Sequence, residues 1–191
     1  MSAPDDAPDD APRPWTRLAS RVLVDRWWLR LREDRVRLPG GVVLDEYHVA
    51  EYPDWACALA LTDGGDAVLV EQYRYGIGRA ILELPAGALD AAEAPDAAAR
   101  RELREETGYD ARQWEALGRL AVEPGRHTNY GHLFVARGAE RAGEPTPDAA
   151  EDLRVRLVPA ADLVGLVEAG RIAHGVHAAA VLWAHARGWL G

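Results

Sequence analysis

The chain has 191 residues, 48% of them apolar, so it can form one large domain, and a wholly disordered chain is excluded. Its 22 basic residues are all arginine, and 31 acidic residues outnumber them, which gives a net charge of −9. The lack of lysine excludes Schiff-base chemistry and a lysine-bearing phosphate loop, and the acidic balance argues against a nucleic-acid-binding surface.

The sequence also bears on where in the cell the protein is found and on whether it spans a membrane. Residues 1–14 alternate pairs of Asp with Pro and Ala, which is typical of a disordered acidic tail. No apolar stretch approaches the roughly 20 residues that span a bilayer, and the N-terminus has no signal pattern. The single cysteine, Cys57, lies in an apolar run, which favours a buried structural thiol and excludes an internal disulfide. We therefore expect a cytoplasmic protein that does not bind membranes.

Residues 15–54 are predicted to form a small antiparallel β unit. Strand-like segments cover residues 21–25, 28–32 and 35–38, and Pro39-Gly40-Gly41 is a hairpin signal before a further strand over residues 41–51. A three-stranded sheet of this size is marginal by itself. We expect it to pack on the rest of the chain or on a second subunit.

Residues 55–191 are predicted to form a mixed α/β domain. The clearest helix covers residues 95–107, since Pro95 stands at its start, Asp96 lies in its first turn and Gly108 follows its end. A loop of residues 138–152 is rich in Gly, Pro, Ala and acids. The remaining predicted elements are strands over residues 56–61, 67–72, 80–84, 114–122, 132–136 and 153–157, and helices over residues 160–168 and 174–187.

Three carboxylates lie on one face of the helix over residues 95–107. Glu102, Glu105 and Glu106 are spaced i, i+3 and i+4, so their like charges cost stability unless something compensates them. A solvated acidic face is one interpretation. The alternative is a site for a hard divalent cation, because Mg²⁺ prefers carboxylate oxygens together with water and phosphate.

The segment around this helix resembles the signature of the Nudix hydrolase family, G-x5-E-x7-R-E-U-x-E-E-x-G-U, in which U is aliphatic. Its fixed positions are occupied by Gly87, Glu93, Arg101, Glu102, Leu103, Glu105, Glu106 and Gly108. The final aliphatic position differs, because Tyr109 stands there.

The resemblance implies an α/β/α sandwich with a mixed sheet, preceded here by the N-terminal antiparallel unit. It implies that Glu102, Glu105, Glu106 and the backbone carbonyl of Ala86 bind Mg²⁺, with Mn²⁺ as an alternative. Gly87, Glu93, Arg101 and Gly108 would have structural roles. The implied reaction is attack of a metal-activated water on one phosphorus of a nucleoside diphosphate linked to another group.

Further segments resemble the branch of ADP-ribose pyrophosphatases and nucleoside-diphosphate-sugar hydrolases. These are Glu71-Gln-Tyr-Arg74, Leu82-Glu-Leu-Pro-Ala-Gly87, and Pro124 at 16 residues after Gly108. Members of this branch are typically homodimers that interlock N-terminal extensions, so we expect a homodimer formed through residues 15–54. The substrate would be a nucleotide sugar.

The resemblance also suggests a catalytic base and residues that bind substrate. Glu151, on the acidic loop before the last strand, is the best match for the base, although a box glutamate such as Glu105 or Glu106 could serve instead. Arg74 is expected to bind phosphate, and Glu83 either contacts the nucleobase or supports the fold. Asn129 departs from the acidic pair that many members carry there, and we assign it to substrate binding.

Aromatic residues leave two alternatives open. Trp28, with Trp27 beside it, could stack on a base, or these side chains could simply pack in a core or interface. His174 and His177 are spaced i, i+3, and we interpret them as surface or capping residues rather than a metal site.

Three functional hypotheses follow. The first is hydrolysis of ADP-ribose or a related nucleotide sugar to a nucleoside monophosphate and a sugar phosphate. The second keeps the chemistry but takes another nucleoside di- or triphosphate or a dinucleotide. The third is a non-catalytic sensor of nucleotide sugars, which the complete set of box glutamates disfavours.

Overall fold

The structure is a computed structural model that describes residues 11–148 and 151–190. Most of the predicted acidic tail and the centre of the predicted loop, residues 149–150, lie outside this description. The chain divides into two compact units, one reaching to Tyr52 and including Glu123–Thr128, the other made of Pro53–Val122 and the chain from Asn129 onward.

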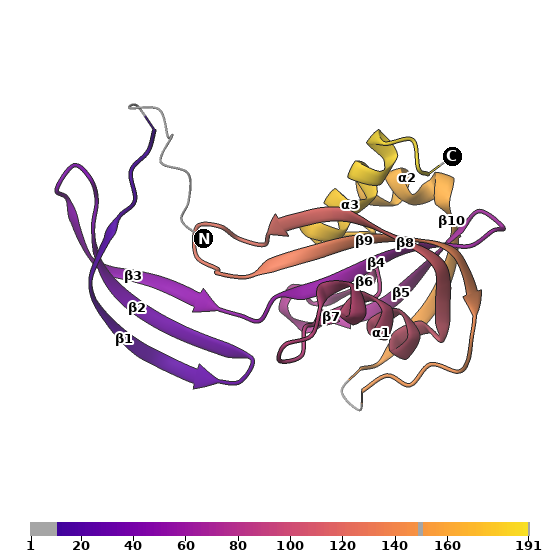
Figure 1. The fold of residues 1–191 in the computed structure, drawn as a ribbon, viewed down its shortest axis with the longest axis horizontal. Coiled ribbons are helices and arrows are strands. Elements are labelled where there is room, and N and C mark those ends of the chain that lie inside the picture. Colours follow the sequence, from indigo (N-terminus) through magenta and orange to yellow (C-terminus); the bar gives the residue numbers. More distant parts are fainter. Residues whose placement is uncertain (1–10, 149–150, 191) are drawn as a thin grey trace. The chain divides into compact units, whose positions relative to one another are not determined.

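The first unit is a three-stranded antiparallel sheet, as predicted, with strand order β1-β2-β3 (Figure 1). The predicted segments over residues 28–32 and 35–38 form one continuous strand. Trp28 does not begin this strand but lies in the turn before it. Gly41 supports the second turn with a φ of +88°. The strands are β1 (Thr16–Arg26), β2 (Leu29–Arg37) and β3 (Val43–Glu51).

The second unit is built on a seven-stranded mixed sheet in which β4 and β9 are parallel and the other pairs are antiparallel. The expected α/β class with a mixed sheet is confirmed. Its strands are β4 (Trp55–Leu61), β5 (Asp66–Arg74), β6 (Arg79–Glu83), β7 (Ala86–Ala88), β8 (Tyr109–Ala121), β9 (Tyr130–Arg141) and β10 (Leu153–Pro159).

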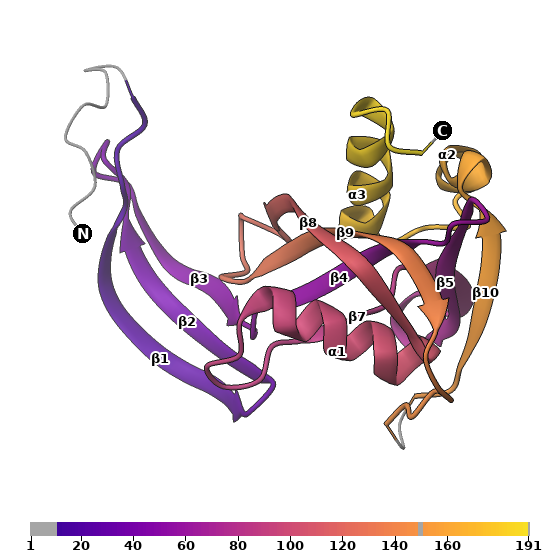
Figure 2. The same cartoon turned by 45° about the vertical axis from the view of Figure 1, so that its right-hand side comes forward.

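Helices cover both faces of this sheet, as Figures 1 and 2 show. On one face lies α1 (Pro95–Thr107), with the bounds that the sequence predicts. The other face carries α2 (Leu163–Glu168) and α3 (Gly175–Ala186), and short 3-10 turns cover Tyr75–Ile77 and Ala160–Asp162. The second unit is therefore an α/β/α sandwich.

The alternation of β4 explains why two different helices can pack on it. Its small side chains Ala56, Ala58 and Ala60 lie in the clusters that include residues of α1, whereas Cys57, Leu59 and Leu61 pack with α2 and α3. Cys57 is fully buried, which confirms the predicted burial of this thiol, and burial raises its pKa.

Two expectations about the second unit are wrong. The loop predicted over residues 138–152 begins later, because β9 continues to Arg141 in register with Tyr109 of β8. The strand β7 is missed, since Ala-Gly-Ala carries no apolar alternation and is held instead by pairing with β4.

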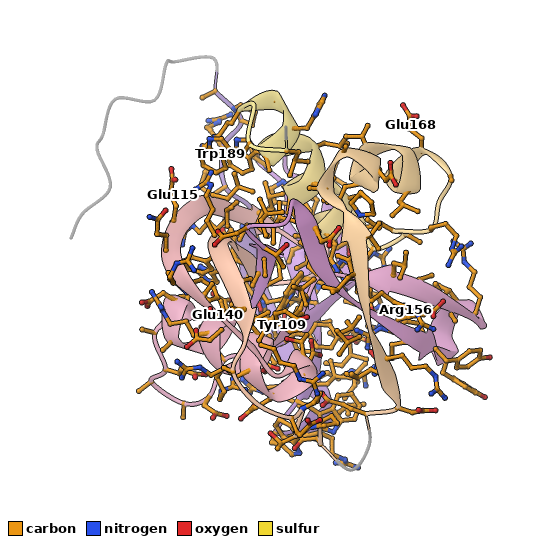
Figure 3. All side chains as sticks on the ribbon, turned by 90° about the vertical axis from the view of Figure 1, so that its right-hand side faces the viewer. Tyr109, Glu115, Glu140, Arg156, Glu168 and Trp189 are labelled. Carbon is orange, nitrogen blue, oxygen red and sulfur yellow. The ribbon has the colours of Figure 1, made fainter. Side chains whose placement is uncertain are left out.

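The interpretation of His174 and His177 as surface or capping residues is also wrong. His177 is 2% exposed, and His174 occupies the N-cap position without a side-chain capping bond. Their rings stack with centroids 4.2 Å apart, and Trp55 contacts both edge-on. In contrast, Glu168 on α2 is exposed at the outer surface (Figure 3). Among the described residues, no helix is long and apolar enough to cross a membrane.

The burial of His177 predicts a pH-dependent stability. Burial holds its pKa well below 6.5, so in acid the unfolded chain takes up a proton that the folded chain does not. The free energy of unfolding should therefore fall as the pH drops below about 6.5, by up to about 1.4 kcal/mol per pH unit. His177→Phe keeps a flat apolar ring and should flatten this profile in urea unfolding. Equal slopes in the two proteins would contradict the assignment.

Candidate functional site

The close packing of β7 against α1 creates the candidate site. Ala86 and Gly87 of β7 pair with Cys57 and Ala56 of β4, beside the face that α1 covers. A Cβ on Gly87 would lie 2.0 Å from Oε1 of Glu102, so any side chain at this position would displace the carboxylate of Glu102. The backbone N–H of Ala86 donates to Glu106 at 3.0 Å. The loop and two of the glutamates are thus in direct contact.

Arg101 links most of the remaining box residues. It makes a two-pronged pair with Glu93 at 2.9 and 3.0 Å and donates to the carbonyl of Ala88 at 3.0 Å. Its Nη1 also donates to Glu102 at 2.6 Å and to Glu105 at 3.1 Å. This arginine lowers the pKa of Glu93, which fits the bracing role expected for the pair.

Burial makes two carboxylates of the cluster unusually basic. Glu106 is 4% exposed, and desolvation, reinforced by the charges of Glu102 and Glu151, raises its pKa to about 8. Desolvation also raises the pKa of Glu102. A buried carboxylate with raised pKa gains strongly from a cation placed beside it.

Among the described residues, the carboxylates are not arranged as the complete ligand set of one metal ion. Within residues 11–148 and 151–190, no three His, Cys, Asp or Glu side chains are arranged to hold one metal ion. Glu102 and Glu105 are instead both paired with Arg101. The chemistry of the donors still suits a hard divalent cation, because carboxylate and carbonyl oxygens are its preferred ligands.

A second group of predicted residues lies on β5 and β6. Arg74 donates from Nε to Glu83 at 2.7 Å, and Arg74 is half exposed while Glu83 is 1% exposed. The other oxygen of Glu83 has no hydrogen-bond partner in the described structure. The positive charge of Arg74 partly opposes the rise in the pKa of Glu106, so this pair and the glutamates of α1 act on one another.

The loop after β9 brings Glu151 to the same group. Thr146 donates its backbone N–H to the carbonyl of Glu105, and the N–H groups of Ala142 and Gly143 donate to Gly108. Glu151 accepts from the N–H of Asp148 at 2.8 Å, and its charge raises the pKa of both Glu102 and Glu106. Backbone contacts of this kind cannot be predicted from side-chain types. The one trace in the sequence is the glycine at position 108, where a Cβ would clash with the backbone of Gly143.

The structure describes the immediate surroundings of two further predicted substrate residues. Asn129 is 6% exposed and donates its amide to the carbonyl of Pro53 at 3.1 Å, which gives it a partner in the backbone. Trp28 belongs to the first unit and is 49% exposed. Their substrate roles stay predictions.

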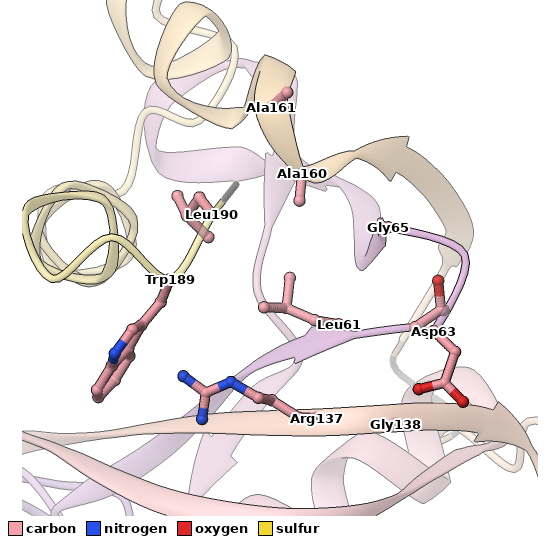
Figure 4. A pocket seen from close by; sticks show the side chains of 10 residues that line it. Leu61, Asp63, Gly65, Arg137, Gly138, Ala160, Ala161, Trp189 and Leu190 are labelled. Atoms are coloured by element: carbon pink, nitrogen blue, oxygen red, sulfur yellow. The ribbon is translucent and has the colours of Figure 1, made fainter.

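A cavity of about 420 Å³ lies at the opposite end of β4 from this site (Figure 4). Leu61 lines it, whereas the loop Ala86–Ala88 pairs with residues 55–57. Its charged side chains already have partners, since Asp63 pairs with Arg112 and Arg137 with Glu115. The clustered carboxylates therefore define the candidate site.

Comparisons with known proteins agree with this geometry. The model of the NUDIX domain matches residues 52–179, and that of the nucleoside diphosphate sugar hydrolase N-terminal domain matches residues 15–50. An ADP-ribose pyrophosphatase of Mycobacterium tuberculosis is 37% identical over 158 residues, which cover 82% of this chain and 76% of that protein. One of Bacillus subtilis is 33% identical, covering 72% and 74%.

The fold is also found among solved structures. The crystal structure of an ADP compounds hydrolase superposes with a TM-score of 0.80 at 21% identity and covers 94% of this chain and 96% of that one. With the family model spanning most of the chain and the box glutamates gathered on α1, this protein belongs to the Nudix hydrolase family.

Proposed function

We propose that this chain hydrolyses the pyrophosphate bond of ADP-ribose or a related nucleoside diphosphate sugar, giving a nucleoside monophosphate and a sugar phosphate. The observation that carries the proposal is the contact of Ala86 and Gly87 with Glu106 and Glu102, which places buried carboxylates against a backbone loop. The activity named for the similar proteins of M. tuberculosis and B. subtilis supports this choice of substrate.

The metal of the proposed reaction is Mg²⁺, with Mn²⁺ as an alternative. Glu102, Glu105, Glu106 and the carbonyl of Ala86 would hold it, after Arg101 releases its bonds to the first two. When bound, the ion supplies positive charge for the phosphate oxygens and acidifies a water molecule.

The chain's own residues supply positioning and proton transfer. Arg74 is fixed by Glu83 through Nε, which leaves its terminal nitrogens to donate to a phosphate group. Glu151 faces the same carboxylates from the loop after β9, and we assign to it the removal of a proton from the attacking water. Glu105, which is the most exposed of the three helix glutamates, is the alternative base.

A substrate panel tests the proposal. With Mg²⁺, ADP-ribose should give AMP and ribose 5-phosphate with a higher kcat/KM than GDP-mannose, nucleoside triphosphates or dinucleotides. Glu106→Gln should lower kcat/KM on the order of 10³-fold, because the substitution removes a buried charge beside the cation. The matched control is Glu168→Gln on exposed α2, which should keep full activity. Full turnover by Glu106→Gln would overturn the mechanism.

Gly87 provides a test of the contact itself. In Gly87→Ala the new methyl group would displace the flexible carboxylate of Glu102, so we expect a folded protein that needs at least roughly tenfold more Mg²⁺ for half-maximal rate. Gly165→Ala is the control, since nothing lies within 4 Å of a Cβ at that helical position. An unchanged Mg²⁺ requirement would show that Glu102 is not a ligand.

We also propose that the chain acts as a homodimer through its first unit. Within the described part of that unit, Val36 is the one buried apolar side chain, while Val22, Leu23, Trp27 and Val42 are each more than 40% exposed. So small a core does not stabilise a sheet of this size, and a second copy would cover the exposed side chains.

We further place the protein in the cytoplasm, where its single buried thiol suits the reducing conditions.

Charged substitutions on β1 test the dimer. Light scattering at about 10 μM should give a dimer mass for the unaltered protein, and Val22→Glu or Leu23→Glu should shift it towards monomer, because a carboxylate would be desolvated in the interface. Arg17→Glu places the same side chain at an exposed polar position of the same strand and should leave the mass unchanged. A monomeric unaltered protein would refute the proposal.

A further inference from the structure

The end of the hairpin formed by β5 and β6 holds two arginines opposite each other. Arg74, the last residue of β5, is the cross-strand partner of Arg79, the first residue of β6. The N–H of Gly78 closes the turn between them, since it donates to the carbonyls of Arg74 at 2.9 Å and Tyr75 at 3.2 Å. The backbone therefore holds the two arginines side by side.

Both arginine side chains lie on the face of the sheet that α1 covers. Val68 of β5 packs in one cluster with Leu103 of α1. Side chains alternate along a strand, and Arg74 follows Val68 at an even spacing in uninterrupted register, so it shares this face. Arg79 shares it too, because directly opposed residues of an antiparallel pair point the same way. The charge of Arg74 accordingly acts on Glu106 of α1.

The protein compensates only one of these two charges. Like charges at directly opposed positions destabilise a sheet. Glu83 accepts from Nε of Arg74 at 2.7 Å, whereas the exposed side chain of Arg79 makes no ion pair with any residue that the structure describes. Other exposed arginines of the second unit do have a carboxylate, as Arg112 has Asp63 at 2.7 Å. Arg79 thus places an uncompensated positive charge beside Arg74.

An anion with two charged groups would fit between these guanidinium groups. Glu83 takes only Nε of Arg74, so the terminal nitrogens of Arg74 and the whole guanidinium of Arg79 can donate. Each guanidinium matches two oxygens of one phosphate. The Cβ atoms of directly opposed residues lie about 4.5–5.5 Å apart, and the phosphates of a diphosphate share one bridging oxygen. The spacing therefore suits one phosphate on each arginine.

We propose that Arg79 is a further substrate-binding residue, which forms with Arg74 a clamp for the diphosphate bridge of the substrate, one guanidinium on each phosphate. This inference rests on the proposed function and deepens it. A clamp on both phosphates fixes the bond between them relative to the glutamates of α1, and it favours diphosphates over monophosphates. It also removes the repulsion between the two arginines when substrate is bound.

The sheet offers a matched control for Arg79. Arg154 of β10 is likewise an exposed strand arginine that makes no ion pair with any described residue. It lies opposite Glu71 of β5, and that register places it on the other face of the sheet from Arg74. Arg79→Gln and Arg154→Gln therefore remove the same charge on opposite faces. Arg79→Lys keeps the charge without the two-pronged geometry and should give an intermediate effect.

The test is calorimetric titration of the full chain with Mg²⁺ present, using AMP and α,β-methylene-ADP, whose P–C–P bridge resists hydrolysis. The unaltered protein and Arg154→Gln should bind the diphosphate more tightly than AMP. In Arg79→Gln the ratio of the two affinities should fall at least about fivefold, because charged hydrogen bonds to one phosphate are lost. Its melting temperature should be equal or higher, since the repulsion is removed, whereas a purely structural role predicts a lower one.

The clamp is overturned if Arg79→Gln and Arg154→Gln give the same affinity ratio, or if the unaltered protein does not prefer the diphosphate. Repeating the titrations with the guanosine analogues makes the result independent of the base. The two proposals can fail separately. Hydrolysis of ADP-ribose with an unchanged ratio in Arg79→Gln refutes the clamp alone, whereas a lowered ratio in a protein that hydrolyses no nucleotide sugar supports the clamp and refutes the proposed function.

Discussion

The close approach of α1 to the strands β4 and β7 is the constraint on which the rest of the site depends. Alanines on one face of β4 and at the start of α1 let the helix come close, and the missing side chain of Gly87 leaves space for the carboxylate of Glu102. At this distance Ala86 can donate its N–H to Glu106. A larger residue at any of these positions would separate the loop from the carboxylates.

This packing also sets the electrostatics of the site. It buries Glu106 and Glu102 among like charges, a placement that raises the pKa of both and that costs stability unless a cation compensates it. Arg101 provides part of that compensation through its bonds to Glu93, Glu102 and Glu105. Cation binding would therefore compete with Arg101 for two of the carboxylates, so this arginine couples the loop to the ligands.

The two units differ in what stabilises them. The second unit has helices on both faces of its sheet and a continuous apolar core. The first has one buried apolar side chain in its described part and many surface ion pairs, such as Arg21 with Glu33 and Arg35 with Asp45. Exposed ion pairs contribute little stability, so apolar burial against a further surface is the stronger source.

The sequence by itself determined the family, the bounds of α1, the mixed α/β class and the three-stranded N-terminal sheet. These features depend on local signals, namely the spacing of the box, the caps Pro95 and Gly108, and turn residues. It could not predict β7, whose three small residues become a strand through pairing with β4, nor the extension of β9 to Arg141 opposite β8.

Only the tertiary structure decided which polar residues are buried and what they contact. The sequence suggested that His174 and His177 are surface or capping residues, but His177 is buried, and both rings pack against each other and against Trp55. It placed three glutamates on one helix face, but the fold buries Glu106 and leaves Glu105 partly exposed. Burial and contact depend on segments far apart in the chain, and no local pattern encodes them.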